Sequence, residues 1–184
     1  PLVTGASGLA LGLPEAFRRA GLLEPMQGLA PLPGVGGPAA VLAGSCSPAT
    51  QAQVRHMART HPALAIDPQA LADGRQGLAA ALAWAREHLP REPVLIYATA
   101  PAEAVAAAQA ALGRDRAGHL VEDTLAAAAV GLREAGVRRL VVAGGETAGA
   151  VLDALGVRQL TIGPEIAPGV PWTIAPGAPP LLLA

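Results

Sequence analysis

Short, unbroken apolar runs alternate with helical patterns along most of this chain, and this alternation limits its fold more than any other feature. Runs without polar interruption, such as 39–43 and 140–143, are typical of strands that are buried on both faces of a sheet. We expect strands at residues 39–43, 63–66, 93–98, 138–143, 157–162, 172–175 and 180–184. We expect helices at residues 14–20, 48–59, 76–88, 101–112, 119–135 and 147–155. Because strands that alternate with helices form parallel sheets, the sequence predicts an α/β fold with three layers and a doubly wound, mostly parallel, Rossmann-like sheet.

The composition excludes nucleic acid as a partner. The formal net charge is -1, so no basic excess is available to neutralise a phosphate backbone. One Phe, one Tyr and two Trp are too few for a stacking surface. The chain has no Lys, and its 13 basic residues other than His are all Arg. A bound phosphate must therefore be held by Arg, by a metal ion or by a group from outside the chain.

The single cysteine, Cys46, allows no internal disulfide, which fits a reducing compartment. No apolar stretch is long enough to span a bilayer, so we expect no membrane partner and a cytoplasmic location. The first residue is Pro rather than Met, and the last four residues are an apolar run. We therefore expect this chain to be a fragment of a longer protein.

Two loops of small residues each follow a buried strand and open a helix. The first is Gly44-Ser45-Cys46-Ser47, and the second is Gly144-Gly145-Glu146-Thr147. Small residues let a ligand approach the backbone closely, and the free N–H groups of a helix start favour negative charge. Because ligands of such sheets lie at the carboxyl ends of the strands, the two loops predict a site for a phosphorylated molecule.

Several of these residues also have simpler explanations. Ser47 and Pro48 suit an ordinary helix start, since Ser is a good N-cap and Pro a good first residue. Glu146 either binds a metal ion or a ribose hydroxyl, or interacts with the helix dipole. We expect Cys46 to be a small buried filler rather than a nucleophile. The segment 165–172 is predicted to be a rigid loop, with a possible second role as a wall of the ligand pocket.

No metal site is predicted from side chains. The four histidines have no metal-ligand spacing, and Glu122 and Asp123 are expected to be surface residues of their helix. Neither a Walker P-loop nor a GxGxxG motif is present.

The ordered set of motifs resembles the C-terminal nucleotide-binding domain of the four-carbon acid sugar kinases, a family once known only as a domain of unknown function. The matching segments are Gly44-Ser45-Cys46-Ser47 with Thr50 and Gln53, Gly144-Gly145-Glu146-Thr147-Ala148-Gly149 with Val151, Leu155-Gly156, Ile162-Gly163 and Pro168-Gly169-Val170-Pro171-Trp172. The stretch 4–9 resembles the last segment of the family's sugar-acid-binding domain. The resemblance thus implies two parts: 1–38 as the end of that N-terminal domain with a linker, and 39–184 as a nucleotide-binding domain truncated at its C-terminus.

The resemblance also implies an activity, namely ATP-dependent phosphorylation of threonate, erythronate or 3-oxo-tetronate, with Mg²⁺ accompanying ATP. The residues that it assigns to the ATP site are Ser45, Ser47, Gly144, Gly145, Glu146 and Thr147. Two departures stand out: Ala148 replaces the family's usual Ser, and the family's Lys-Ser-Gly-Asn-Phe-Gly segment does not follow 181–184. The catalytic base is not identified, and we expect little or no kinase activity from the 184 residues alone.

Two other functions remain open from the residues. One is a non-catalytic α/β module that binds a nucleotide or phosphosugar, and the other is an NAD-dependent oxidoreductase, which the missing GxGxxG disfavours. The Ala-rich helix at 101–112 could pack closely against a partner, so a homo-oligomer is possible.

Overall fold

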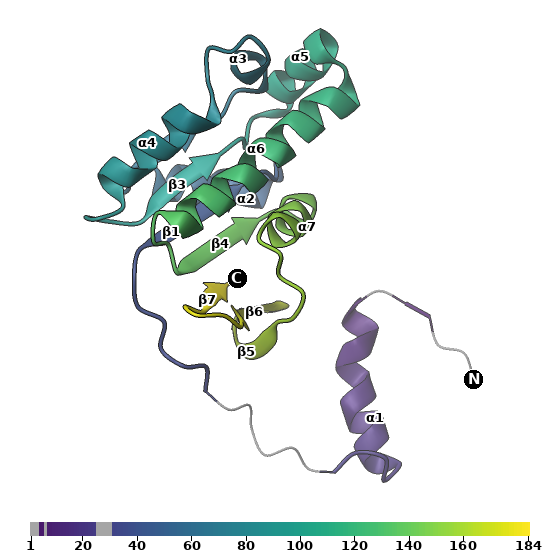
Figure 1. Cartoon of the computed structure of the whole chain (residues 1–184). Coiled ribbons are helices and arrows are strands. Elements are labelled where there is room, and N and C mark those ends of the chain that lie inside the picture. Colours follow the sequence, from purple (N-terminus) through teal and green to yellow (C-terminus); the bar gives the residue numbers. More distant parts are fainter. Residues whose placement is uncertain (1–3, 6, 25–30) are drawn as a thin grey trace. The chain divides into compact units, whose positions relative to one another are not determined.

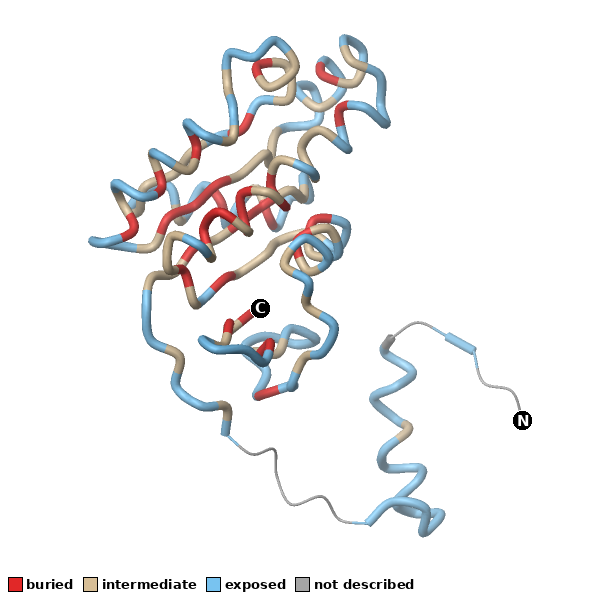
Figure 2. Tube along the Cα trace, viewed as in Figure 1, coloured by how far each residue is buried: buried red, intermediate tan, exposed pale blue. Residues whose placement is uncertain are grey.

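The computed structural model describes residues 4–5, 7–24 and 31–184, and the chain divides into two compact units, 1–30 and 31–184. In the first unit a short 3-10 helix, η1 (Ser7–Gly12), runs directly into α1 (Leu13–Arg19). Glu15 accepts hydrogen bonds from Arg18 at 3.2 Å and from Arg19 at 3.0 Å across the surface of α1. None of the residues of α1 is buried (Figure 2).

The second unit contains a seven-stranded sheet with the strand order β2-β3-β1-β4-β7-β6-β5 (Figure 1). Its parallel part consists of β1 (Ala39–Ala43), β2 (Ala63–Ala65), β3 (Val94–Tyr97), β4 (Arg139–Ala143) and β7 (Leu181–Leu183). The strand β6 (Val170–Ala175) pairs antiparallel with β7 and with β5 (Thr161–Ala167). The predicted α/β sheet, mostly parallel, is confirmed.

Helices cover both faces of this sheet. Three of them, α4 (Leu78–His88), α6 (Arg114–Glu134) and α7 (Gly145–Ala154), contribute to one hydrophobic cluster. The helix α2 (Pro48–Met57) packs on the opposite face, where Val54 contacts Ala43 and Leu95. Neighbouring residues of β1 therefore belong to opposite faces of the sheet, as the two-residue period of a strand requires. Leu42 is in the first cluster and Ala43 in the second.

The main core lies between the sheet and α6. Its fully buried side chains include Leu42, Ile96, Leu125, Leu132 and Leu140. Leu125 and Leu132 are two helical turns apart, so they lie on the same face of α6. At Gly131 a side chain would overlap Leu82 of α4, so the absence of a Cβ allows α4 and α6 to pack closely.

Two further helices lie at the carboxyl ends of the strands. The short helix α3 (Pro68–Ala72) was not predicted from the sequence; it follows β2 closely, with Asp67 as its N-cap. The Ala-rich helix α5 (Ala102–Leu112) packs on α6 and α3. Among the residues of 4–5, 7–24 and 31–184, no helix is both long and apolar enough for a bilayer crossing.

The C-terminal part differs most from expectation. A strand was expected at 157–162 and a rigid loop at 165–172, but the structure has a hairpin of β5 and β6 with its turn at Gly169, which has a φ of 77°. The prolines of this segment made it resemble a connector. Pro164 is tolerated because β5 is an edge strand and its pairing between Ile162 and Ala167 contains register shifts. Pro171 is tolerated in β6 because the pairing of β6 with β7 involves only Thr173 to Ala175.

Candidate functional site

The two loops of small residues meet in space, because the strands that precede them are neighbours. The backbone N–H groups of Gly44 and Ser45 both donate to the carbonyl of Ala143, at 3.1 and 3.2 Å. After β1 the chain turns toward β2, whereas after β4 it turns toward β5 at the opposite edge of the sheet. The carboxyl ends of β1 and β4 thus form a topological switch point, which is where ligands of open α/β sheets bind.

Both glycines at this point are required by packing. A Cβ on Gly44 would overlap Oγ1 of Thr147. Gly144 has a φ of 132°, and a Cβ there would come within 3.1 Å of Thr147 Oγ1 and 3.2 Å of Ser45 N. The side chain of Thr147, only 4% exposed, therefore fills the space between the two loops.

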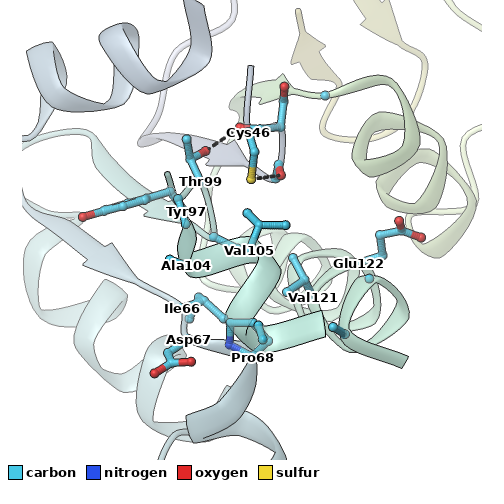
Figure 3. A pocket seen from close by; sticks show the side chains of 18 of the residues that line it. Cys46, Ile66, Asp67, Pro68, Tyr97, Thr99, Ala104, Val105, Val121 and Glu122 are labelled. Carbon is cyan, nitrogen blue, oxygen red and sulfur yellow. Dashed lines mark hydrogen bonds between the residues drawn. The ribbon is translucent and has the colours of Figure 1, made fainter. Parts of the chain in front are cut away.

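A third loop, at the end of β3, is attached to the first. The hydroxyl of Thr99 donates to the carbonyl of Ser45 at 2.8 Å and lies 3.4 Å from that of Ala43 (Figure 3). These bonds hold the Gly44-Ser45 backbone in place from the side opposite Thr147's loop. Thr99 was not identified from the sequence, although a hydroxyl residue just after a buried strand was a usable signal.

A cavity of about 790 Å³ opens over these loops. This volume is within the usual range for small-molecule sites, about 300–1,000 Å³. Residues that follow β1, β2, β3 and β4 line it, together with α5, α6 and the start of α7 (Figure 3). Part of the lining is glycine-rich and part is apolar, the latter including Ile66, Pro68, Val105 and Val121.

The charges of the cavity are all negative. Asp67, Glu122 and Glu146 line it, and no Arg does within the described residues. Asp67 is already engaged as the N-cap of α3, where it accepts from Gln69 N at 2.8 Å. Among the described residues, the donors that this cavity offers a phosphorylated ligand are uncharged backbone and side-chain groups, and a positive charge would have to come from outside the chain.

The two helix starts at the switch point differ in their free N–H groups. At α2 the hydroxyl of Ser47 accepts from Thr50 N at 3.1 Å, so the helix is capped by its own side chain. At α7 the N-cap is Gly144, and no side chain caps the helix. The N–H groups of its first turn therefore remain available to a ligand, and Gly145 and Glu146 of this turn line the cavity.

Five of the six residues assigned to the ligand site from the sequence line this cavity: Ser45, Gly144, Gly145, Glu146 and Thr147. Ser47 does not line it, since its hydroxyl caps α2 and lies 3.0 Å from that of Thr50. The expectation for Cys46 is wrong, because this residue is exposed and lines the cavity. Nothing in the segment 165–172 lines the cavity, so that segment is not a wall of this site.

Several polar lining residues were missed by sequence reasoning or assigned to the surface, among them Glu122, Asp67 and Thr99. Glu122 is half-buried and reaches the cavity from α6 (Figure 3). Asp67 and Thr99 reach it from the loops after β2 and β3. No group of three or more His, Cys, Asp or Glu that could hold a metal ion occurs within the part of the chain that the structure describes.

The fold and this cavity define the class of protein: a doubly wound α/β domain with a ligand cleft at the carboxyl ends of its parallel strands. A family model described as "Nucleotide-binding C-terminal domain" matches residues 40–184. The chain belongs to this family.

Relatives with curated names extend the comparison. The chain is 59% identical over 185 residues to a 3-oxo-tetronate kinase of Cupriavidus necator, covering 100% of this chain and 42% of the relative. It is also 59% identical to a 3-oxo-tetronate kinase of Burkholderia multivorans, covering 100% of this chain and 43% of that one. The chain thus spans less than half the length of these relatives. The resemblance to the sugar-acid kinase family is confirmed.

A solved structure agrees with the fold. The chain is similar to a Haemophilus influenzae protein of the DUF1537 family, with a TM-score of 0.79 and 33% identity over 94% of this chain and 42% of that one.

Proposed function

We propose that this chain is the ATP-binding half of a kinase that phosphorylates a four-carbon sugar acid, with 3-oxo-tetronate as the first substrate to test. The observation that carries the proposal is the cleft at the switch point, where two glycine loops pack together beside the uncapped start of α7. The substrate class rests on the printed names of the relatives.

The cleft fits ATP in size and in chemistry. Its glycine loops allow a triphosphate to approach backbone N–H groups, which favour negative charge at the start of α7. The apolar side chains of Ile66, Val105 and Val121 offer a surface for the flat base. We assign Ser45, Gly144, Gly145, Glu146 and Thr147 to the phosphate end, and Ser47 to the support of its first loop.

The lining also fits Mg²⁺ bound together with ATP. In proteins Mg²⁺ is usually held by one or two carboxylates, phosphate oxygens and water, rather than by a full set of side chains. Among the described residues the cleft supplies carboxylates and no Arg, and carboxylates are the side chains that such a shared ion needs. When bound, Mg²⁺ would neutralise charge on the phosphates; Glu146, in the first turn of α7, is a candidate ligand.

The residues of this chain would position the phosphates and stabilise their charge, which is most of what a protein contributes to phosphoryl transfer. The acceptor hydroxyl and the catalytic base would come from the remainder of a longer protein, as the 42% coverage of the relatives suggests. We place residues 1–38 at the end of that substrate domain and its linker, with 31–38 as the part of the linker that packs on the nucleotide-binding unit, and we place the enzyme in the cytoplasm. Closure of the two domains would exclude water from the reaction.

A pair of glycine variants tests the nucleotide site. Gly145 lines the cleft and Gly149 does not, yet both lie on α7 and a Cβ at either position meets nothing within 4 Å. We expect Gly145→Leu to weaken ATP binding about 100-fold or more, equivalent to about 2.8 kcal/mol, because a bulky side chain would occupy the phosphate end. Gly149→Leu should leave it unchanged. Calorimetric titration with ATP measures both, and equal affinity for the two variants would contradict the site.

A coupled assay of ADP release tests the reaction. The longer protein that contains this chain is given ATP with threonate, erythronate or 3-oxo-tetronate in turn, and the 184-residue chain is the comparison. We expect ADP release only from the longer protein and only with a tetronate. ATP binding without release on any sugar acid would favour a non-catalytic nucleotide-binding module instead.

A further inference from the structure

Glu122 is a charged residue in the cleft that no interaction within the described residues explains. It lies on α6, is half-buried and lines the cavity (Figure 3). The ion pairs of the described part of the chain join Arg18 and Arg19 to Glu15, Arg75 to Asp73, and Arg158 to Asp153. Taking a carboxylate partly out of water is unfavourable unless a partner compensates. Glu122 is therefore a candidate ligand for a cation from outside the chain.

Glu122 lies beside the glycine loops. On the same helix, Leu125 packs beneath Gly44, where an added Cβ would lie 3.3 Å from Leu125 Cδ1. Glu122 precedes Leu125 by three residues, which corresponds to about 4.5 Å along a helix axis. The uncapped start of α7 belongs to the same region, because Thr147 in its first turn and Leu125 of α6 would both meet a Cβ added at Gly44.

The charges at this end of the cleft conflict unless a cation is present. The free N–H groups of α7 attract phosphate, whereas the carboxylates of Glu122 and Glu146 repel it. A divalent cation between carboxylate and phosphate turns both repulsions into attractions. Mg²⁺ coordinates oxygen ligands of these two kinds.

We propose that the carboxylate of Glu122 binds the divalent cation that accompanies the nucleotide, directly or through one of the cation's waters. The inference deepens the proposed function and rests on it. Glu122 is then a binding residue that holds the metal–phosphate complex from the α6 side of the cleft, opposite the backbone of α7. It makes nucleotide binding depend on the metal ion, because without the metal the same carboxylate repels the phosphates.

Calorimetric titration with ATP, in excess Mg²⁺ and separately in EDTA, tests this role. The protein should bind ATP more tightly with Mg²⁺ than without it. In Glu122→Gln we expect binding of Mg²⁺–ATP to weaken about tenfold, and binding of metal-free ATP to become tighter than in the unmodified protein, because a repulsive charge is gone. A merely structural role would weaken both titrations to the same extent.

Two further variants serve as controls. Asp123→Asn removes the neighbouring charge on α6, which is exposed and does not line the cleft, and it should change neither titration. Glu122→Asp keeps a carboxylate and should retain part of the preference for Mg²⁺–ATP. A second possibility is that Glu122 binds the ribose hydroxyl, and titration with 2′-deoxy-ATP tests it. In that case the unmodified protein would bind ATP more tightly than 2′-deoxy-ATP, and Glu122→Gln would bind the two equally.

An unchanged effect of Mg²⁺ in Glu122→Gln overturns the inference, and so does a loss of discrimination against 2′-deoxy-ATP. Failure of the unmodified protein to bind ATP under either condition is a different result, since it overturns the proposed nucleotide site itself.

Discussion

Gly44 shows how one residue connects packing with binding in this domain. Its Cα faces the hydroxyl of Thr147, so even a methyl group would overlap that atom. A Cβ would also press on Leu125, which is fully buried in the core beneath. The glycine therefore does more than leave room for a ligand, because it lets two loops and α6 pack against one another.

We expect Gly44→Ala to lower the free energy of unfolding by about 1–3 kcal/mol, the usual cost of overpacking a tight contact. Urea denaturation followed by circular dichroism measures it. The control is Gly118→Ala, which also adds a methyl group to the cleft lining but meets nothing within 4 Å. Gly118 is in a helix, so this control should keep or slightly raise stability. If the urea midpoint of unfolding were the same for Gly44→Ala and Gly118→Ala, the two loops would not be packed as described.

At the scale of the element, α2 and α7 begin at the same edge of the sheet but differ in how they are capped. Ser47 caps α2 through Thr50 N and does not line the cleft. We expect Ser47→Ala to cost about 1 kcal/mol of stability, as the loss of a side-chain cap does, while ATP affinity stays unchanged. Thermal unfolding and calorimetry on the same samples measure both. Ser45→Ala, at a position that lines the cleft, is the comparison. If Ser47→Ala bound ATP more weakly while its stability equalled that of the unmodified protein, Ser47 would belong to the ligand site after all.

The elements of the central sheet could be predicted from the sequence because buried parallel strands leave a direct signal. The strand at 39–43 has the predicted bounds, and the long helix α6 follows its apolar spacing. The helix α3 has only five residues, too few to show a helical period. The hairpin of β5 and β6 was hidden by Pro and Gly, residues that more often mark loops.

The candidate site also contains residues that could be predicted from the sequence and residues that could not. The two glycine loops could be found because each is contiguous in the sequence and each follows a strand. Glu122 could not, since on its helix it resembles any exposed acid, and only the packing of α6 beside Gly44 brings it to the cleft. Thr99 is likewise significant only through its bond to Ser45, which is 54 residues away in the chain.

At the scale of the whole molecule, the core belongs entirely to the second unit. The buried hydrophobic residues of the described chain run from Ala40 to Leu183, and α1 buries none of its residues. The segment 31–38, expected to be a linker, belongs to that unit by its contacts. Leu32 packs on Gly163, at a point where a Cβ would overlap it. The carbonyl of Pro38 accepts from Arg138 N at 3.0 Å, and that of Gly37 accepts from the Arg139 side chain at 2.9 Å.

Two truncations test where the stable unit begins. Removal of residues 1–30 should leave the free energy of unfolding unchanged, because α1 contributes nothing buried. Removal of residues 1–38 should lower it by about 1–3 kcal/mol, since it deletes one packed Leu side chain and the four hydrogen bonds that the carbonyls of Gly37 and Pro38 accept from Arg138 and Arg139. Urea titration of the two truncated chains beside the 184-residue chain gives the comparison. Equal stability of both truncations would make 31–38 a true linker, and a loss in the shorter deletion would show that residues 1–30 support the core.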